Sequence, residues 1–228
     1  MRVLIFSAVV PLAFVLGGGC DRAGSSGQSV TASIDTELPD TPAAQQNAKS
    51  EPPLLAPQFP VVVIDTSLGE FRVQLDLEKA PITGKNYLWY ASNGHYDGTI
   101  FHQVVPNYMA LGGGYTPEFV EKPTQFWIRN EAYNGLKNKK GTIAMARRPD
   151  EADSSTCQFF LNLTDNPHLD HQSRDSAATY GYCVFGKVVD GNEVLDKLSE
   201  VSVEDRDAFS SVPQSAVVIR KVTVPKSP

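Results

Sequence analysis

The chain has 228 residues, of which 20 % are charged and 41 % hydrophobic, with a formal net charge of −6 at pH 7. This length holds one sizeable domain or two small ones. The net negative charge argues against nucleic-acid binding, which needs a basic surface to contact the phosphates. The charge is too modest for disorder throughout the chain.

Residues 1–20, MRVLIFSAVVPLAFVLGGGC, have the pattern of an export signal. Arg2 supplies the positive end, and residues 3–16 form an apolar core too short to span about 30 Å of hydrocarbon. Small residues precede Cys20, as in bacterial lipoprotein signals that end at a lipidated cysteine. Gly17 stands where a leucine-like residue is usual, so ordinary secretory cleavage stays open. We expect an extracytoplasmic protein, in the periplasm or at the cell surface, anchored to a membrane through Cys20.

Residues 21–58 contain no aromatic side chain and are rich in Gly, Ser, Thr, Ala, Gln and Pro. Such a segment buries too little apolar surface to offset its ordering entropy. We expect a disordered tether with an average reach of roughly 35 Å. The folded domain is expected to occupy residues 59–228.

The domain opens with two predicted strands, at 61–65 and 70–76, joined by the turn residues 66–69. In the second strand apolar and polar residues alternate, which predicts one buried face and one solvent-exposed face. Residues 80–94 then predict a helix, with Pro81 near its start and Gly94 at its end. Gly84 inside this helix costs about 1 kcal/mol relative to alanine.

Short apolar strands follow, separated by Gly-rich or polar turns, at residues 99–105, 108–112, 141–146, 158–163 and 182–189. A second helix is predicted at 191–200, and the closing strand at 215–224. Many short strands, two helices and no repeating βαβ pattern predict a mainly β fold, either an antiparallel sheet or a closed barrel.

The two cysteines inside the domain, Cys157 and Cys183, could form a disulfide in an oxidising compartment. They could equally remain unpaired as small apolar residues. No CxxC or Cys/His spacing suggests zinc, and the HxxH formed by His168 and His171 is more typical of a solvated loop. We therefore expect neither metal nor cofactor.

Six stretches, in their order and spacing, resemble the cyclophilin family over about residues 60–226. They are KNYLWY (85–90), TIFHQVV (99–105), NYMALGGG (107–114), NEAYNGLKNKKGTIAMAR (130–147), CQFFLNL (157–163) and GYCVFGKVVDGNEVLDKL (181–198). The resemblance implies a closed eight-stranded antiparallel barrel capped by two α-helices, with a groove for prolyl peptides on its outer face. It also implies peptidyl-prolyl cis-trans isomerase activity.

Carried over position by position, the resemblance implies a catalytic groove formed by Gln103, Leu111, Tyr108, Met109 and Phe160. It implies further substrate contacts from Phe101, Ala146, Arg147, His168, Leu169 and Tyr182. Tyr108 stands where the family usually has phenylalanine, and His168 where members commonly have Trp or Phe. Tyr182 stands where relatives have His or Tyr.

Two positions depart from the family pattern at the catalytic groove. Gln103 replaces the arginine that favours the twisted amide, and Leu111 replaces the glutamine that positions this arginine. Gln103 can still donate a hydrogen bond, but a neutral donor forms a bond about half as strong as a charged one. We therefore expect weakened catalysis, or help from Arg147 or Arg148 in the neighbouring loop.

Two functions follow from these residues. The first is a peptidyl-prolyl isomerase that assists the folding of exported proteins. The second is a chaperone or adaptor module that binds proline-containing peptides with little catalysis, which the residues at 103 and 111 favour. An inert structural domain is disfavoured, because the pocket-forming residues remain. We expect a monomer whose partners are proline-containing peptides or unfolded exported proteins.

Overall fold

The computed structural model of the protein describes residues 58–224. The predicted export signal, Cys20 and nearly all of the predicted tether lie outside the described residues, as do the last four residues. Within residues 58–224, no helix is long and apolar enough to cross a membrane.

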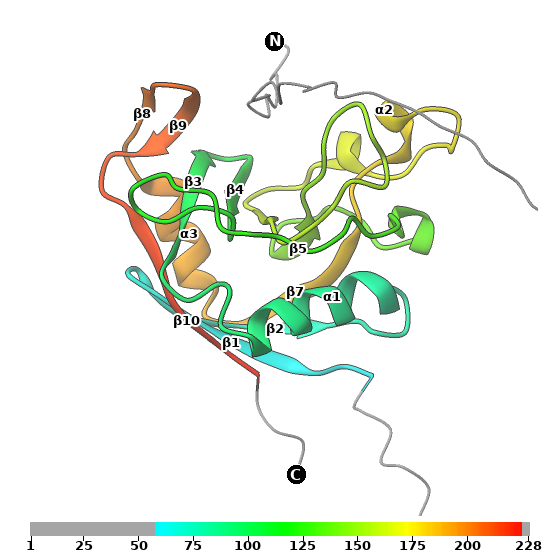
Figure 1. Cartoon of the computed structure of the whole chain (residues 1–228), viewed down its shortest axis with the longest axis horizontal. Helices are drawn as coiled ribbons and strands as arrows, with labels where there is room; N and C mark the ends of the chain where they lie inside the picture. The colour runs from blue at the N-terminus through cyan, green and yellow to red at the C-terminus, as the bar shows by residue number, and fades with distance from the viewer. Residues whose placement is uncertain (1–57, 225–228) are drawn as a thin grey trace, which may run out of the picture. The chain divides into compact units, whose positions relative to one another are not determined.

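Eight strands close into an antiparallel barrel in the order β1-β10-β3-β4-β6-β5-β7-β2 (Figure 1). This confirms the predicted fold class. The strands are β1 (Val61–Thr66), β2 (Gly69–Leu75), β3 (Thr99–Val105), β4 (Met109–Gly112), β5 (Thr142–Met145), β6 (Phe159–Asn162), β7 (Val184–Asp190) and β10 (Val217–Thr223).

Alternation along the strands fills the barrel interior. In β1, Val62 and Ile64 are fully buried while Val61 and Val63 are partly exposed, as the two faces of a strand require. The interior core also contains Phe159, Phe185 and Tyr87, whose rings pack tilted or edge-on. Aromatic pairs of this geometry stabilise a core beyond the area they bury.

The two helices expected from the sequence are α1 (Pro81–Ser92) and α3 (Asn192–Glu200). Helix α1 packs against β7 and β10, and α3 packs against β2, β3 and β4. Gly84 has a packing role in α1, because a Cβ atom there would lie 2.3 Å from Leu77 Cδ2. An alanine at this position would require the Leu77 side chain to move, which offsets the higher helix propensity of alanine.

Several short elements were not predicted. They are the 3₁₀ helices η1 (Ala132–Asn134) and η2 (Pro167–Leu169), the four-residue helix α2 (Ala177–Tyr180), and a separate two-stranded sheet of β8 (Val203–Arg206) and β9 (Phe209–Pro213). The hairpin of β8 and β9 lies beside β3 at one side of the barrel (Figure 1).

Cys157 and Cys183 are both buried and unpaired in the structure. The Cys183 sulfur lies 3.4 Å from Thr83 Oγ1. Burial raises the pKa of each thiol to about 12, so both stay protonated and unreactive near neutral pH.

Candidate functional site

An apolar cluster covers the outer face of the barrel where β4, β6 and β5 run side by side. The strand register aligns Leu111 with Phe160, and Phe160 with Ala144, so the three side chains share this face. Their chain neighbours, such as Ala110 and Phe159, point into the barrel interior instead. The outer cluster is separate from the barrel core and contains Met109, Leu111, Ala144, Phe160, Leu169 and Val184.

A pocket opens in this cluster. All its lining residues are among those that the sequence singled out: Met109, Leu111, Ala146, Arg147, Phe160, Leu169 and Tyr182. Met109 and Phe160 are each only 2 % exposed, so the pocket offers a dry, largely apolar wall. Such a wall suits an apolar ring rather than a charged or strongly hydrated group.

Two aromatic side chains and a histidine contact the outer cluster or its rim. Tyr108 packs against the cluster, and its ring stacks on His168 with centroids 5.5 Å apart. His168 Nε2 lies 3.1 Å from the Tyr108 hydroxyl. Tyr182 packs edge-on against Phe160. Burial raises the pKa of both tyrosines, so their hydroxyls remain protonated near neutral pH.

Arg147 stabilises the wall of the pocket through hydrogen bonds to backbone carbonyls. Its guanidinium donates to the carbonyls of four residues and lies 4.5 Å from the centroid of the Tyr182 ring. Because most of its N–H donors are used in these hydrogen bonds, Arg147 orders the wall of the pocket. Arg148 stacks on Trp127 and pairs with Asp150 instead. Both guanidinium groups thus have other partners in the structure, and the help expected from these arginines in catalysis stays a prediction.

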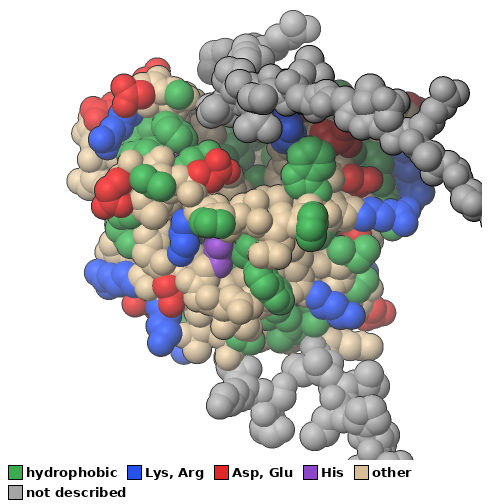
Figure 2. Space-filling model, in the orientation of Figure 1, with side chains coloured by type: hydrophobic (Ala, Val, Ile, Leu, Met, Phe, Trp, Pro, Cys, Tyr) green, Lys and Arg blue, Asp and Glu red, His purple; other side chains and the backbone are tan. Residues whose placement is uncertain are grey.

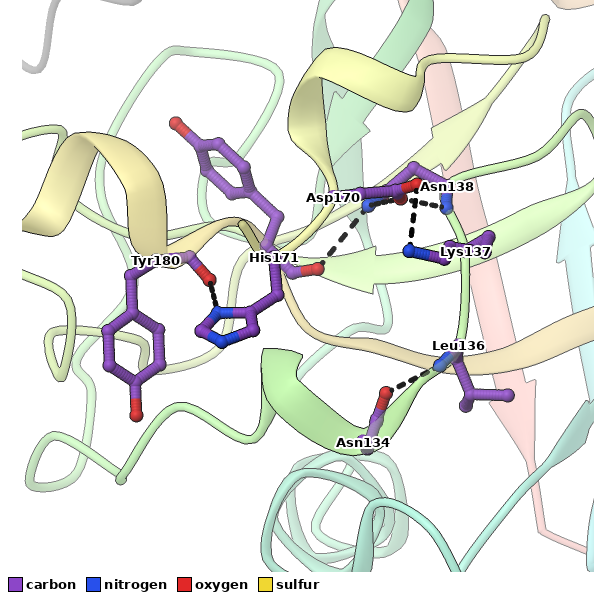
Figure 3. Close-up of polar contacts among 8 residues, drawn as sticks. Asn134, Leu136, Lys137, Asn138, Asp170, His171 and Tyr180 are labelled. Carbon is purple, nitrogen blue, oxygen red and sulfur yellow. Dashed lines mark hydrogen bonds and ion pairs between the residues drawn. The ribbon is translucent and has the colours of Figure 1, made fainter. Parts of the chain in front are cut away.

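A polar network fixes the loop that carries Leu169. Asp170 accepts hydrogen bonds from the backbone N–H of Asn138 at 2.7 Å and from its side-chain amide at 3.1 Å, and Lys137 Nζ lies 3.5 Å away (Figure 3). Leu169 itself accepts the backbone N–H of Tyr182 at 2.9 Å. These contacts hold two walls of the pocket to each other.

His168 and His171 make separate contacts. His168 meets Tyr108, whereas His171 Nδ1 lies 2.7 Å from the Tyr180 carbonyl (Figure 3). Among residues 58–224, no group of three or more His, Cys, Asp or Glu side chains is arranged to hold a metal ion. His168 thus contacts the rim of the pocket through Tyr108, and His171 contacts the end of α2 through Tyr180.

A β-bulge places Gln103 beside the pocket. In the pairing of β3 with β4, Phe101 lies opposite Gly112 and Gln103 lies opposite Leu111, so β3 has one extra residue. Such a bulge re-aims the side chains that follow it. Gln103 therefore lies next to Leu111 at the edge of the apolar cluster. It is not one of the residues that line the pocket. Its amide nitrogen donates to Ser210 Oγ at 2.9 Å.

Phe101 is the predicted site residue that the structure does not bring to the groove. Its side chain is fully buried in the barrel interior, where it packs edge-on against Phe159. The prediction of a substrate contact at Phe101 is corrected accordingly. The bulge explains the difference, because Phe101 lies on the interior side of it and Gln103 on the outer side.

Sequence reasoning missed Ser210, the residue that contacts Gln103. It lies 107 positions further along the chain, in a hairpin that was not predicted. No local pattern links the two residues. The site thus combines an apolar pocket for a ring with a neutral amide donor at its edge.

Comparisons with known proteins agree with this geometry. The family model described as cyclophilin type peptidyl-prolyl cis-trans isomerase/CLD matches residues 61–224. Peptidyl-prolyl cis-trans isomerase A of Dickeya dadantii is 46 % identical over 165 residues, which cover 72 % of this chain and 84 % of that protein. Peptidyl-prolyl cis-trans isomerase B of Escherichia coli is 43 % identical over 164 residues, covering 72 % and 99 %.

A solved structure is also similar. A cyclophilin type peptidyl-prolyl cis-trans isomerase of Cryptosporidium parvum, crystallised in the presence of the dipeptide Ala-Pro, has a TM-score of 0.61 and 26 % identity to this chain. The match covers 73 % of this chain and 99 % of that one.

Proposed function

The chain belongs to the cyclophilin-type peptidyl-prolyl cis-trans isomerase family, and on this premise we propose that it isomerises prolyl bonds in exported proteins with a neutral catalytic donor. The observation that carries the proposal is the dry pocket of Met109, Phe160 and Leu169 with Gln103 at its edge. The similar Cryptosporidium structure was crystallised in the presence of the dipeptide Ala-Pro, which supports proline-containing peptides as the ligand class here.

The chemistry explains why such a pocket suffices. Rotation about a peptide bond breaks its resonance and meets a barrier of about 18–20 kcal/mol. A catalyst lowers this barrier by binding the twisted amide more tightly than the planar one, with no covalent step. The pocket would hold the proline ring, while the Gln103 amide would donate to the twisted, single-bonded amide. Ala146 and Arg147 would contact the substrate chain at the pocket wall.

Catalysis is expected to be weaker than with an arginine at position 103. Losing one preorganised donor costs on the order of 10²–10³ in rate. A neutral donor retains about half of a charged donor's hydrogen-bond strength. A penalty of roughly ten- to thirtyfold follows if the Gln103 bond is retained.

A chaperone or adaptor module that binds proline-containing peptides is the second candidate. Gln103 and Leu111 favour it, because together they remove both the charged donor and its polar neighbour on β4. The apolar pocket would serve this function equally well, since binding alone needs no differential stabilisation of the twisted amide.

The place of action is proposed from the first twenty residues. The pattern MRVLIFSAVVPLAFVLGGGC supports export and a lipid on Cys20, with residues 21–58 as a tether that holds a monomeric domain off the membrane. Unfolded exported proteins would then be the substrates, in the periplasm or at the cell surface.

The experiment that separates the two candidates is NMR exchange spectroscopy on a short Ala-Pro peptide. Wild type is expected to accelerate cis/trans exchange, and Phe160→Ala, which removes a pocket wall, is expected to lose both binding and acceleration. Phe126→Ala is the matched control, because the Phe126 side chain is 91 % exposed. Exposed apolar side chains are common on the face drawn in Figure 2. Binding of the peptide without acceleration would favour the adaptor function.

A further inference from the structure

The hairpin of β8 and β9 is a small sheet outside the barrel that packs against β3, the strand that carries Gln103. Figure 1 shows it beside β3 and away from the strands β5 and β7. This position brings the hairpin into contact with Gln103 at the edge of the pocket.

Aromatic contacts hold the hairpin in place. The Phe209 ring lies 6.1 Å from His102, 5.2 Å from Tyr115 and 4.9 Å from Phe119, measured between centroids. The Arg206 guanidinium lies over the Phe119 ring at 4.8 Å. Phe209 therefore wedges between β3 and the loop that follows β4, directly before Ser210 in the chain.

Backbone geometry fixes the next two residues. Ser211 has a φ of +54°, in the left-handed region that few residues other than glycine adopt, and its N–H donates to Asp205 Oδ1 at 2.9 Å. The following residue, Val212, is buried. Ser210 is thus held between an aromatic wedge and a fixed turn, although its own side chain is exposed.

The Ser210 hydroxyl accepts a hydrogen bond from Gln103 Nε2 at 2.9 Å. On the other side, Gln103 faces Leu111 of β4, an aliphatic side chain that offers no hydrogen bond. A primary amide has two N–H donors. One N–H of Gln103 donates to Ser210, and this hydrogen bond sets the rotation of the amide. The second N–H is left to donate to a group bound beside Leu111.

We propose that Ser210 is a positioning residue that orients the Gln103 amide for prolyl isomerisation. The hairpin supplies from outside the barrel the polar neighbour that β4 lacks at Leu111. This inference rests on the proposed function, because it assigns the catalytic donor to Gln103. It adds a residue and an element that the pocket itself does not include.

The test uses the full chain and two single variants of adjacent serines. Ser210→Ala removes the accepting hydroxyl and is expected to lower kcat about three- to tenfold in NMR exchange with an Ala-Pro peptide, with KM unchanged. Ser211→Ala removes a hydroxyl from the same hairpin but keeps the backbone N–H that donates to Asp205, so it is expected to leave both constants unchanged. Equal losses in the two variants would overturn the inference, since they would indicate a general disturbance of the hairpin.

A double-mutant cycle isolates the route through Gln103. In a Gln103→Ala background, Ser210→Ala is expected to have no further effect on kcat. A further loss of similar size in that background would overturn the inference, because Ser210 would then act without Gln103.

A second measurement does not depend on activity. The heteronuclear ¹⁵N NOE of the Gln103 side-chain amide is expected to report a restricted group in wild type and a mobile one in Ser210→Ala. A mobile amide in wild type would overturn the positioning role even if the enzyme is active. A restricted amide in a wild type that binds the peptide without accelerating exchange would instead contradict the proposed function.

Discussion

His102 is a buried imidazole next to Gln103 on β3, and its Nδ1 atom has no hydrogen-bond partner among the described residues. Burial lowers its pKa from the usual 6.5 to about 4. Between these two values the unfolded chain binds more protons than the folded one, so stability falls as the pH falls. The full loss, complete below pH 4, is about 3 kcal/mol.

The expected outcome is a decline in the free energy of unfolding, measured with urea, from pH 7 to pH 4. A His102→Phe variant keeps an aromatic ring against Tyr115 and Phe209 but cannot take up a proton. Its stability should decline less over the same range. Parallel profiles for wild type and variant would show that His102 does not cause the decline.

Tyr87 offers a second prediction for a single residue. Its hydroxyl is buried in the barrel core without a partner among the described residues, and burial raises its pKa far above the usual range. Removing an unsatisfied buried group avoids its desolvation cost, so Tyr87→Phe should stabilise the protein by about 1–3 kcal/mol.

Tyr96→Phe is the matched control for that change. The Tyr96 hydroxyl donates to the Cys157 carbonyl at 2.9 Å, so its removal leaves a buried acceptor without a partner. The variant should be less stable than wild type in thermal or urea unfolding. The account of Tyr87 fails if both substitutions destabilise the protein equally.

Helix α1 shows how a distant side chain can stabilise an element. The residue before the helix, Ala80, has no capping side chain. Glu131, 5 % exposed, instead accepts the N–H groups of Ile82 and Thr83 at 3.1 and 2.8 Å and the Thr83 hydroxyl at 2.8 Å. A carboxylate at this end also complements the helix dipole.

Glu131→Ala is therefore expected to destabilise the protein by roughly 3 kcal/mol, because it leaves buried donors of the first helical turn without an acceptor. Urea unfolding measures this loss. Glu70→Ala removes an exposed carboxylate paired with Arg72 at 3.4 Å, and should cost less than about 1 kcal/mol. Similar losses in the two variants would contradict the capping role of Glu131.

The eight barrel strands and two main helices could be predicted because their sequences carry strong local patterns. The second predicted strand, 70–76, differs from β2 by one residue at each end, since alternation of Phe71, Val73 and Leu75 marks it clearly. The β8–β9 hairpin could not be predicted, because its segment VEDRDAFSSVP has little apolar alternation. Its position depends on the contacts of Phe209 with residues distant in sequence.

The candidate site was predictable to a similar degree. Every residue that lines the pocket could be named from the resemblance, because the matching stretches keep their order and spacing. The interior position of Phe101 could not, since the bulge in β3 shifts the alternation by one residue. The hydrogen bonds between Gln103 and Ser210 and between Glu131 and Thr83 join residues far apart in the chain. No local sequence pattern predicts such contacts.

For the whole molecule, Cys20 makes the proposed anchor testable. If it carries a lipid, full-length protein expressed in a bacterium should sediment with membranes, and Cys20→Ala should move it to the soluble extracytoplasmic fraction. Immunoblots of both fractions measure this. Wild type that is soluble after export would indicate ordinary secretory cleavage instead.

The central claim for the molecule is that it is an isomerase that works through a neutral donor. The most direct measurement is kcat/KM for an Ala-Pro peptide, by NMR exchange, for wild type and the double variant Gln103→Arg/Leu111→Gln. We predict measurable acceleration by wild type and a rate roughly ten- to thirtyfold higher for the double variant. Equal rates for the two proteins, or peptide binding by wild type with no acceleration, would contradict the claim.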